Sequence, residues 1–190
     1  MKSIRENDPT FEDHEGNSIF HMSIIKDEQE VFDKIIEDPE FIREQLNLRN
    51  VDGKSPLFLA VEHGRRAMFD KLFDERFLEH LDLRSKDTIH GNTPLHIACE
   101  KEEVEVAEKI FKYEEELCMH PNYQGRSPFF VACQRRNMDI LRIFEEWKTK
   151  AIMVQDYLGE NMLFVCAREG DVEIFNWFGG SNNFYRARGQ

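Results

Sequence analysis

Apolar residues recur along this chain in two short helical patterns that follow one another five times. The first pattern places a large apolar residue and, three positions later, a small one. The large residues are Phe20, Leu57, Leu95, Phe129 and Leu163, and the small ones are Ser23, Ala60, Ala98, Ala132 and Cys166. The second pattern places four apolar residues on one helical face, as in Val31, Phe32, Ile35 and Ile36. The patterns predict five pairs of helices, with a close approach between neighbours at each small residue.

Each expected helix pair is preceded by a turn built around one glycine. These glycines, Gly16, Gly53, Gly91, Gly125 and Gly159, are 37, 38, 34 and 34 residues apart. Two residues after each glycine stands a residue that favours a helix N-cap: Ser18, Ser55, Thr93, Ser127 and Asn161. Three residues before each glycine stands a short polar residue expected to bond backbone N–H groups of the turn: Asp13, Asn50, Thr88, Asn122 and Asp156. Such a recurrence is typical of a stacked repeat array, not of a globule with one cleft.

These residues resemble the ankyrin repeat family. The family signature T-P-L-H-x-A is present as Thr93-Pro94-Leu95-His96-Ile97-Ala98. Repeats 2 and 4 replace its histidine by phenylalanine, at Phe58 and Phe130, and repeats 1 and 5 match through their register. The resemblance covers about residues 13 to 180. It implies an all-α solenoid of about five repeats, each a turn or hairpin tip plus two antiparallel helices, and hydrogen bonds from His21 and His96 that tie neighbouring turns together.

The repeat spacing also predicts the domain organisation. We expect an N-terminal extension at 1–12 and one repeat domain at 13–190, with repeats at about 13–49, 50–87, 88–121, 122–155 and 156–190. The first two intervals are longer, and residues 38–46 and 75–81 carry apolar side chains at helical spacing. We therefore expect an extra helical turn after repeats 1 and 2, packed on the outer edge.

The end of the sequence suggests a longer array. One further period of 34 from Gly159 would place a glycine at 193, three residues beyond Gln190. We therefore expect the repeats to continue into a following segment. The last expected helix is strongly apolar, so Phe175, Trp177 and Phe178 would form an exposed patch, unless Phe184-Tyr185-Arg186 covers it.

Composition narrows the class of function. The net charge of −12 argues against generic nucleic-acid binding, because most of the surface would repel a phosphate backbone. No run approaches the roughly 20 apolar residues that span a bilayer, and residues 1–8 lack the core of a signal peptide. We expect an intracellular, cytoplasmic protein without direct membrane insertion. Cys99, Cys133 and Cys166 lie on apolar helical segments and are predicted to be reduced core residues, neither disulfides nor metal ligands.

The candidate chemistry is weak. His80, Asp82, Asp87 and His90 form the densest polar cluster, but they lack the ligand spacing of a zinc site and are interpreted as a solvated loop. No phosphate-binding loop of the form G-x-x-x-x-G-K-[ST] is present, and Gly179-Gly180 is read as a helix C-cap. We predict no catalytic residues, no metal and no cofactor, and hence no enzymatic activity.

Partner binding is the function that the resemblance implies. In ankyrin-like stacks the turn tips and the inner face of each first helix line a concave groove. The candidate residues at such positions are His90, Lys101, Tyr123, Arg126, Gln134, Arg135, Tyr157 and Arg168. The tyrosines and arginines of repeats 4 and 5 stand out, because both residue types are enriched among binding hot spots. We predict that they have no packing role and recognise an acidic or phosphorylated segment of another protein.

Two alternatives stay open at this point. The arginines of repeats 4 and 5 could simply balance nearby acids, such as Glu145, Glu146, Glu160 and Glu169, as solvated surface pairs. The whole array could be a scaffold or adaptor, or the N-terminal regulatory or assembly region of a larger enzyme or ion channel.

Overall fold

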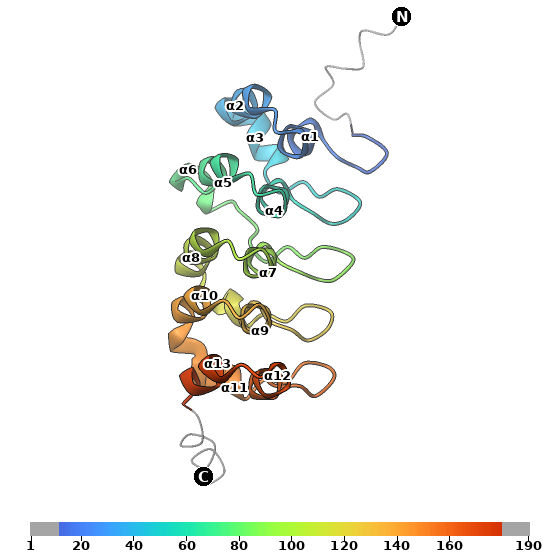
Figure 1. Cartoon of the computed structure of the whole chain (residues 1–190). Helices are drawn as coiled ribbons and strands as arrows, with labels where there is room; N and C mark the ends of the chain where they lie inside the picture. Colours follow the sequence, from blue (N-terminus) through green and yellow to red (C-terminus); the bar gives the residue numbers. More distant parts are fainter. Residues whose placement is uncertain (1–11, 180–190) are drawn as a thin grey trace, which may run out of the picture. The chain divides into compact units, whose positions relative to one another are not determined.

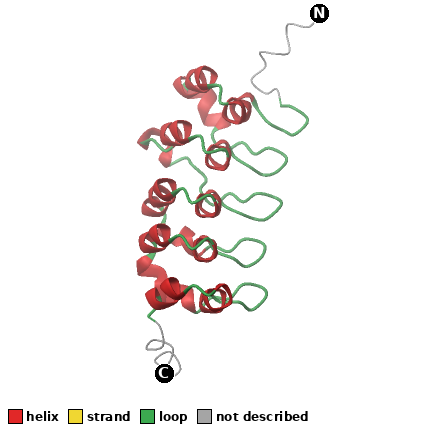
Figure 2. Cartoon of the chain, in the orientation of Figure 1, coloured by secondary structure: helices red, strands yellow, loops and turns green. Residues whose placement is uncertain are grey.

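The chain consists of short helices joined by turns. The computed structural model describes residues 12–179, which contain helices and two isolated antiparallel bridges but no extended strand (Figures 1 and 2). Most of the expected N-terminal extension, as well as Gly180 and the segment Phe184-Tyr185-Arg186, lies outside the described residues. The chain forms two compact units, residues 1–97 (unit 1) and 98–190 (unit 2).

Unit 1 contains the first two complete repeats. Its helices are α1 (Ile19–Lys26), α2 (Gln29–Glu37), α3 (Pro39–Gln45), α4 (Pro56–Glu62), α5 (Arg66–Leu72) and α6 (Glu75–Leu78), followed by the start of α7 (Pro94–Glu100). Helices α1 and α4 lie side by side, with their turn tips on one side and α2 and α5 on the other (Figure 1).

Unit 2 contains the remaining helices. They are α8 (Val104–Tyr113), the 3-10 helix η1 (Glu115–Met119), α9 (Pro128–Gln134), α10 (Met138–Ile143), η2 (Glu145–Trp147), α11 (Lys148–Ile152), α12 (Met162–Glu169) and α13 (Val172–Trp177). The first helices α9 and α12 pack against each other, as α8 and α10 do. Within this unit the tips again project from the first helices on the side away from the second helices (Figure 1).

The turn tips form through the short polar residue that the sequence places before each glycine. In tip 1 the Asp13 Oδ1 accepts hydrogen bonds from the N–H groups of Glu15 and Asn17, both at 2.8 Å. In tip 4 the Asn122 Oδ1 accepts from Gln124 N–H at 2.9 Å and from Arg126 N–H at 3.0 Å. Each of these bonds satisfies a backbone donor inside a tight turn, so the side chain fixes the shape of the tip.

Tip 3 departs from the expected register by one residue. The prediction that Thr88 is the turn residue is wrong, because the Asp87 side chain accepts the hydrogen bonds of the turn instead. Its Oδ1 accepts from Ile89 N–H (2.9 Å) and His90 N–H (2.6 Å), and its Oδ2 accepts from Asn92 N–H at 2.9 Å. This tip therefore holds one residue more than the others, and the extra residue accounts for part of the longer interval before Gly91.

The buried face of each first helix follows the sequence pattern. The large residues Phe20, Leu57, Leu95, Phe129 and Leu163 are buried, as are the small residues Ser23, Ala60, Ala98, Ala132 and Cys166. The N-cap side chains Ser55, Ser127 and Asn161 each accept a bond from the backbone N–H three residues later. The caps, with a helix-starting Pro in repeats 2 and 4, fix where these helices begin. Helices this short are marginal in isolation, so the buried stripe supplies the packing that stabilises them.

The four cysteines are free and buried, and burial was expected from the sequence for Cys99, Cys133 and Cys166. Cys133 and Cys166 come from neighbouring repeats, and their Sγ atoms are 3.7 Å apart, a weak thiol hydrogen bond rather than a covalent one.

Helical turns occur between all repeats. The expected turns after repeats 1 and 2 are α3 and α6, and both begin at an aspartate cap, Asp38 and Asp74. The structure adds η1 after repeat 3 and η2 with α11 after repeat 4. Helix α11 is held by Lys148, whose Nζ donates to the Trp177 carbonyl at 3.0 Å and lies 4.7 Å from the centre of the Trp177 ring.

The exposed apolar patch expected from Phe175, Trp177 and Phe178 near the end of the sequence is mostly covered. Phe178 is buried, because its ring packs against Phe129 with the ring centres 6.1 Å apart, and Trp177 is half-buried. The expectation was therefore wrong for Phe178. On the first helix of this repeat, α12, the aromatic side chain of Phe164 is 57% exposed.

His21 ties repeat 1 to repeat 2 as the resemblance implies. Its Nδ1 lies 3.2 Å from Ser18 N–H and must accept that bond, so Nε2 carries the proton. Nε2 then donates to the carbonyls of Leu48 and Lys54, both at 3.1 Å. Burial lowers the pKa of His21, more than the two carbonyls raise it. The neutral ring is the form that fits this site.

This site predicts a loss of stability in mild acid. Because the pKa of His21 is lower in the folded state, its contribution is complete above the unfolded-state value of about 6.5 and declines as the pH falls from there toward the folded pKa. The slope is at most ~1.4 kcal/mol per pH unit. Urea unfolding at about pH 7.5 and about pH 5.5 should show a smaller pH difference for His21→Phe than for the wild-type chain. Phenylalanine is the matched replacement, because Phe58 and Phe130 occupy the same position in repeats 2 and 4. An equal pH difference for both proteins would exclude this role for His21.

Candidate partner-binding surface

Tips 4 and 5 are joined by an ion pair between a half-buried arginine and a buried carboxylate. The Arg126 Nε lies 3.2 Å from the Asp156 Oδ2, and the Asp156 side chain has no exposed area. Asp156 also accepts from Leu158 N–H at 2.9 Å and Glu160 N–H at 3.0 Å through its Oδ1. The guanidinium of Arg126 also lies over the Phe130 ring, 5.6 Å from its centre. The expectation that Arg126 has no packing role is therefore wrong.

The ionisation of Asp156 reflects these contacts. Burial alone would raise the pKa of this carboxyl, but the hydrogen bonds from Glu160 N–H, Arg126 and Leu158 N–H outweigh it and lower the pKa below its ordinary value. The carboxylate is thus the form that holds tip 5 on tip 4.

Tyr157 is positioned by a backbone hydrogen bond and by its packing on Gly125. Its N–H donates to the Gln124 carbonyl at 3.1 Å. A Cβ atom on Gly125 would lie 2.7 Å from the Tyr157 Cδ1 and 2.8 Å from its backbone nitrogen, so the ring and backbone pack directly on this glycine. Gly125 also has φ of +77°, which disfavours any other residue. Only glycine lets the two tips approach this closely.

Large side chains at these two tips are exposed to solvent. Tyr123 is 56% exposed, Tyr157 74% and Leu158 77%. Leu158 follows Tyr157 directly and has the larger exposed fraction. The repeat register marks it as a tip residue, since it occupies the same place in tip 5 as Gln124 does in tip 4, although it is not among the eight residues singled out from the sequence.

Arg135 is the C-cap residue that follows α9, Arg168 lies in the last turn of α12, and both form surface ion pairs. The Arg135 Nη2 is 2.9 Å from the Glu100 Oε1, and both side chains are about half exposed. Arg168 contacts Glu169 at 3.0 Å as well as Glu160. Hydrogen bonds to Glu169 and Glu160 raise the pKa of Arg168, which stays charged at any physiological pH. The sequence alternative that nearby glutamates balance these arginines is thus realised for Glu160 and Glu169.

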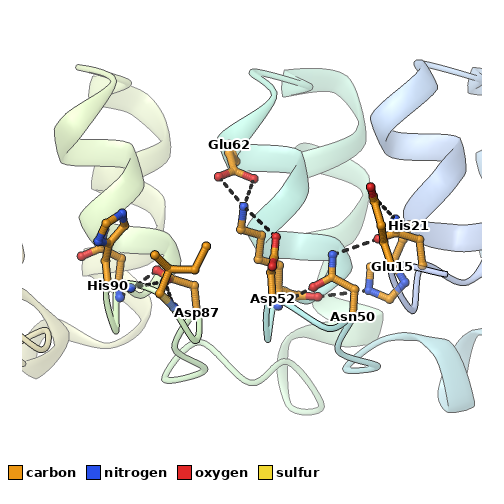
Figure 3. Close-up of polar contacts among 11 residues, drawn as sticks. Glu15, His21, Asn50, Asp52, Glu62, Asp87 and His90 are labelled. Atoms are coloured by element: carbon orange, nitrogen blue, oxygen red, sulfur yellow. Dashed lines mark hydrogen bonds and ion pairs between the residues drawn. The ribbon is translucent and has the colours of Figure 1, made fainter. Parts of the chain in front are cut away.

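The remaining candidates are placed as follows. Gln134 is half-buried near the end of α9, and Lys101 is exposed just after α7. His90 belongs to unit 1 and is the exposed last residue of the enlarged tip 3, where Asp87 holds its backbone (Figure 3).

Tips 1 and 2 show a different surface. The Lys54 Nζ lies 2.9 Å from the Glu62 Oε1 and 3.8 Å from the Asp52 Oδ2, so two carboxylates surround one ammonium group (Figure 3). The Asn50 Nδ2 donates to the Asn17 Oδ1 at 2.9 Å and links the two tips. The charge of this surface is balanced or acidic, and it lacks the paired tip tyrosines of repeats 4 and 5.

The polar cluster near His80 has structural roles. Asp82 pairs with Arg49 at 2.6 Å and donates its N–H to the Asn47 Oδ1 at 2.9 Å, while Asp87 shapes tip 3. Within residues 12–179, no group of three or more His, Cys, Asp or Glu side chains is arranged to hold a metal ion.

None of the helices in the described part of the chain has the length and apolar character to cross a bilayer.

Solved structures share this fold at low sequence identity. The ankyrin repeat domain of Bcl-3, a member of the IkappaB protein family, matches with a TM-score of 0.68 and 19% identity, over 83% of this chain and 66% of that one. A chain from the complex of the Bd0816 predatory endopeptidase of Bdellovibrio bacteriovorus with the immunity protein Bd3460 matches with a TM-score of 0.73 and 15% identity, over 92% and 87% of the two chains. The ankyrin repeat protein EF0377 matches with a TM-score of 0.70 and 20% identity, over 92% and 85%. This chain thus spans just under two thirds of the Bcl-3 domain. No curated protein matches its sequence.

The family itself is shown by sequence. A family model described as ankyrin repeats (3 copies) matches residues 41–118 and 72–146, which together make up more than half of the chain. The all-α solenoid class expected from the repeat pattern is confirmed. Ankyrin repeats are generally protein–protein interaction modules. The sequence matches and the repeated tip and helix pair lead to one conclusion: this chain belongs to the ankyrin repeat family.

Proposed function

We propose that repeats 4 and 5 bind an extended acidic segment of another protein. The surface consists of Tyr123, Arg135, Tyr157, Leu158 and Arg168, which we call the repeat 4–5 surface. The observation that carries this proposal is the exposure of two tyrosines and a leucine, each more than half exposed, in the same two repeats as two exposed guanidinium groups. We also propose the repeat boundaries given by the sequence as the modules of this array.

The aromatic residues are suited to act as anchors. Tyrosine supplies a large contact area and a polar hydroxyl while losing little conformational freedom on binding. Tyr157 is already held by its backbone bond to Gln124 and by its packing on Gly125, so a partner would meet a preorganised ring.

The arginines are suited to take an acidic partner. Exposed ion pairs such as Arg135 with Glu100 contribute little to stability, because solvent screens both charges. A carboxylate or phosphate from a partner can therefore replace the internal glutamate at small cost. A guanidinium donates two parallel hydrogen bonds to either group, and phosphate is the stronger candidate because it carries more negative charge and more acceptor oxygens.

The test is a charge reversal at the two arginines. Peptides selected by the wild-type chain from a displayed library of random short peptides should be enriched in Asp and Glu, and phosphorylating a serine within them should tighten binding. The double variant Arg135→Glu/Arg168→Glu should bind the same peptides at least roughly tenfold more weakly, because each hot-spot arginine would now repel the acidic chain. Its unfolding midpoint should be nearly that of the wild type.

A matched control has the same change of charge elsewhere in unit 2. Arg142 on α10 and Lys112 on α8 are exposed and lie on second helices, each paired with an acid of its own helix. Arg142→Glu/Lys112→Glu should leave peptide affinity unchanged. Equal weakening by both double variants would show a general charge effect, and selected peptides without acidic enrichment would rule out the acidic partner.

A further inference from the structure

A cavity of about 830 Å³ lies in unit 1 beside the inserted helices α3 and α6. Its apolar wall is formed by Ile36 at the end of α2, Ile42 on α3, Leu46 just after it, and Phe77 on α6. All four side chains are at most 8% exposed. The volume lies in the range of small-molecule sites, which are typically lined by apolar side chains with a few polar groups at fixed places.

The polar lining of this cavity is mainly basic. It consists of the residues Arg43, Arg76, His80, Asn47 and one acidic residue, Glu37. Arg76 lies over the Phe77 ring, 5.0 Å from its centre, and pairs with the exposed Asp74 at 2.8 Å. For Arg43, no ion pair is found with any residue between 12 and 179. The two arginines make the lining of this cavity locally basic, although the chain as a whole has a net charge of −12.

The cavity is held open by contacts between repeats 1 and 2. Asn47 is the key residue, since its Nδ2 donates to the His80 carbonyl at 2.5 Å and its Oδ1 accepts from Asp82 N–H at 2.9 Å. Arg49 reinforces this link through its ion pair with Asp82. These bonds fix the segment after α3 against the segment after α6. The walls therefore come from the end of α2 and from the segments around α3 and α6 that follow repeats 1 and 2.

We propose that this cavity binds a small aliphatic carboxylate. The hydrocarbon chain would lie against Ile42, Leu46 and Phe77, and the carboxylate would lie between the Arg43 and Arg76 side chains. An apolar wall favours burial of methylene groups at about 0.8 kcal/mol each, and a guanidinium is matched to a carboxylate by two parallel hydrogen bonds. This site is separate from the repeat 4–5 surface and does not depend on the function proposed for it.

The test uses decanoate with the full chain labelled at isoleucine methyl groups. Decanoate, below the concentration at which it forms micelles, should shift the Ile36 and Ile42 methyl resonances and reach saturation. Acetate should not, because it has no chain to bury, and decanol should bind at least roughly tenfold more weakly, because it has no charge for the arginines. Absence of any methyl shift with decanoate, or equal binding of decanol, would overturn the proposal.

Two variants separate the arginines from general charge. Arg43→Glu should weaken decanoate binding at least roughly tenfold, and Arg76→Glu should act in the same direction. Lys34→Glu is the matched control, since Lys34 is exposed in the last turn of α2 just as Arg43 is in the last turn of α3. Lys34→Glu should bind as the wild type does. Equal weakening by Arg43→Glu and Lys34→Glu would contradict the site, as would a leucine-containing acidic peptide that shifts the same methyl groups at lower concentration than decanoate.

Discussion

Replacing Phe129 by alanine is expected to destabilise unit 2 by about 3–5 kcal/mol, the usual cost of removing a buried phenylalanine from a packed core. Phe129 has no exposed area, and its ring contacts those of Phe144, Trp177 and Phe178 with centres 5.7, 6.2 and 6.1 Å away. It therefore joins the helices of repeat 4 to the last helix of repeat 5. Urea unfolding followed by tryptophan fluorescence should show the loss directly, because Trp177 belongs to the same cluster.

The matched control for this prediction is Phe164→Ala. Phe164 lies on the first helix of repeat 5 but is 57% exposed, so its removal should cost less than about 1 kcal/mol. A similar loss in both variants would mean that the aromatic cluster is not the main link between the repeats.

The helices and tips could be predicted from sequence because each depends on residues close together in the chain. An N-cap residue such as Ser127 bonds an N–H three residues away, and Asn122 bonds N–H groups within four residues. The same local logic failed at tip 3, where counting back from Gly91 pointed to Thr88. An aspartate stood one position earlier, and Asp87 is the stronger acceptor for several N–H groups.

Two ion pairs of the candidate surface could not be predicted from local pattern. Arg126 meets Asp156, 30 residues later, and Arg135 meets Glu100, 35 residues earlier. These separations are close to one repeat, as is that between Arg49 and Asp82. A search for opposite charges one repeat apart would have found all three pairs. It would also have given Arg126 a structural role. It would not have shown that the Asp156 carboxylate is buried while the Arg135 and Glu100 side chains are exposed, because exposure is known only from the structure.

Leu158 and the α3/α6 cavity show a second limit. The repeat register places Leu158 in a tip, but it does not give the exposed fraction of the side chain, which is set by the turn that Asp156 holds. The cavity is lined by residues from two insertions of different length, and no repeat pattern relates Ile42 to Phe77. Both features depend on how neighbouring repeats are joined.

The joint between tips 4 and 5 provides the second large effect. Asp156→Ala would leave the Leu158 and Glu160 N–H groups and the Arg126 guanidinium without their buried acceptor. We expect a loss of about 2–4 kcal/mol, because unsatisfied buried donors cost about 1–3 kcal/mol each and part of the tip will regain water. Chemical denaturation measures this loss. Peptide binding to the repeat 4–5 surface should also weaken, since Tyr157 and Leu158 follow Asp156 directly.

Asp156→Asn separates the charge from the turn. Asn122 forms the same kind of turn in tip 4, so asparagine can keep the two backbone bonds and lose only the ion pair with Arg126. We expect a loss of about 1 kcal/mol near neutral pH.

The same variant tests the charge of Asp156 through pH. Because the pKa of Asp156 is lowered in the folded state, its contribution is present above the unfolded-state value of about 3.9 and is lost as the pH falls through the folded value. The stability difference between the wild type and Asp156→Asn should therefore shrink in acid below about pH 4. A difference that stays constant down to about pH 2 would mean that the Asp156 charge does not hold the two tips together.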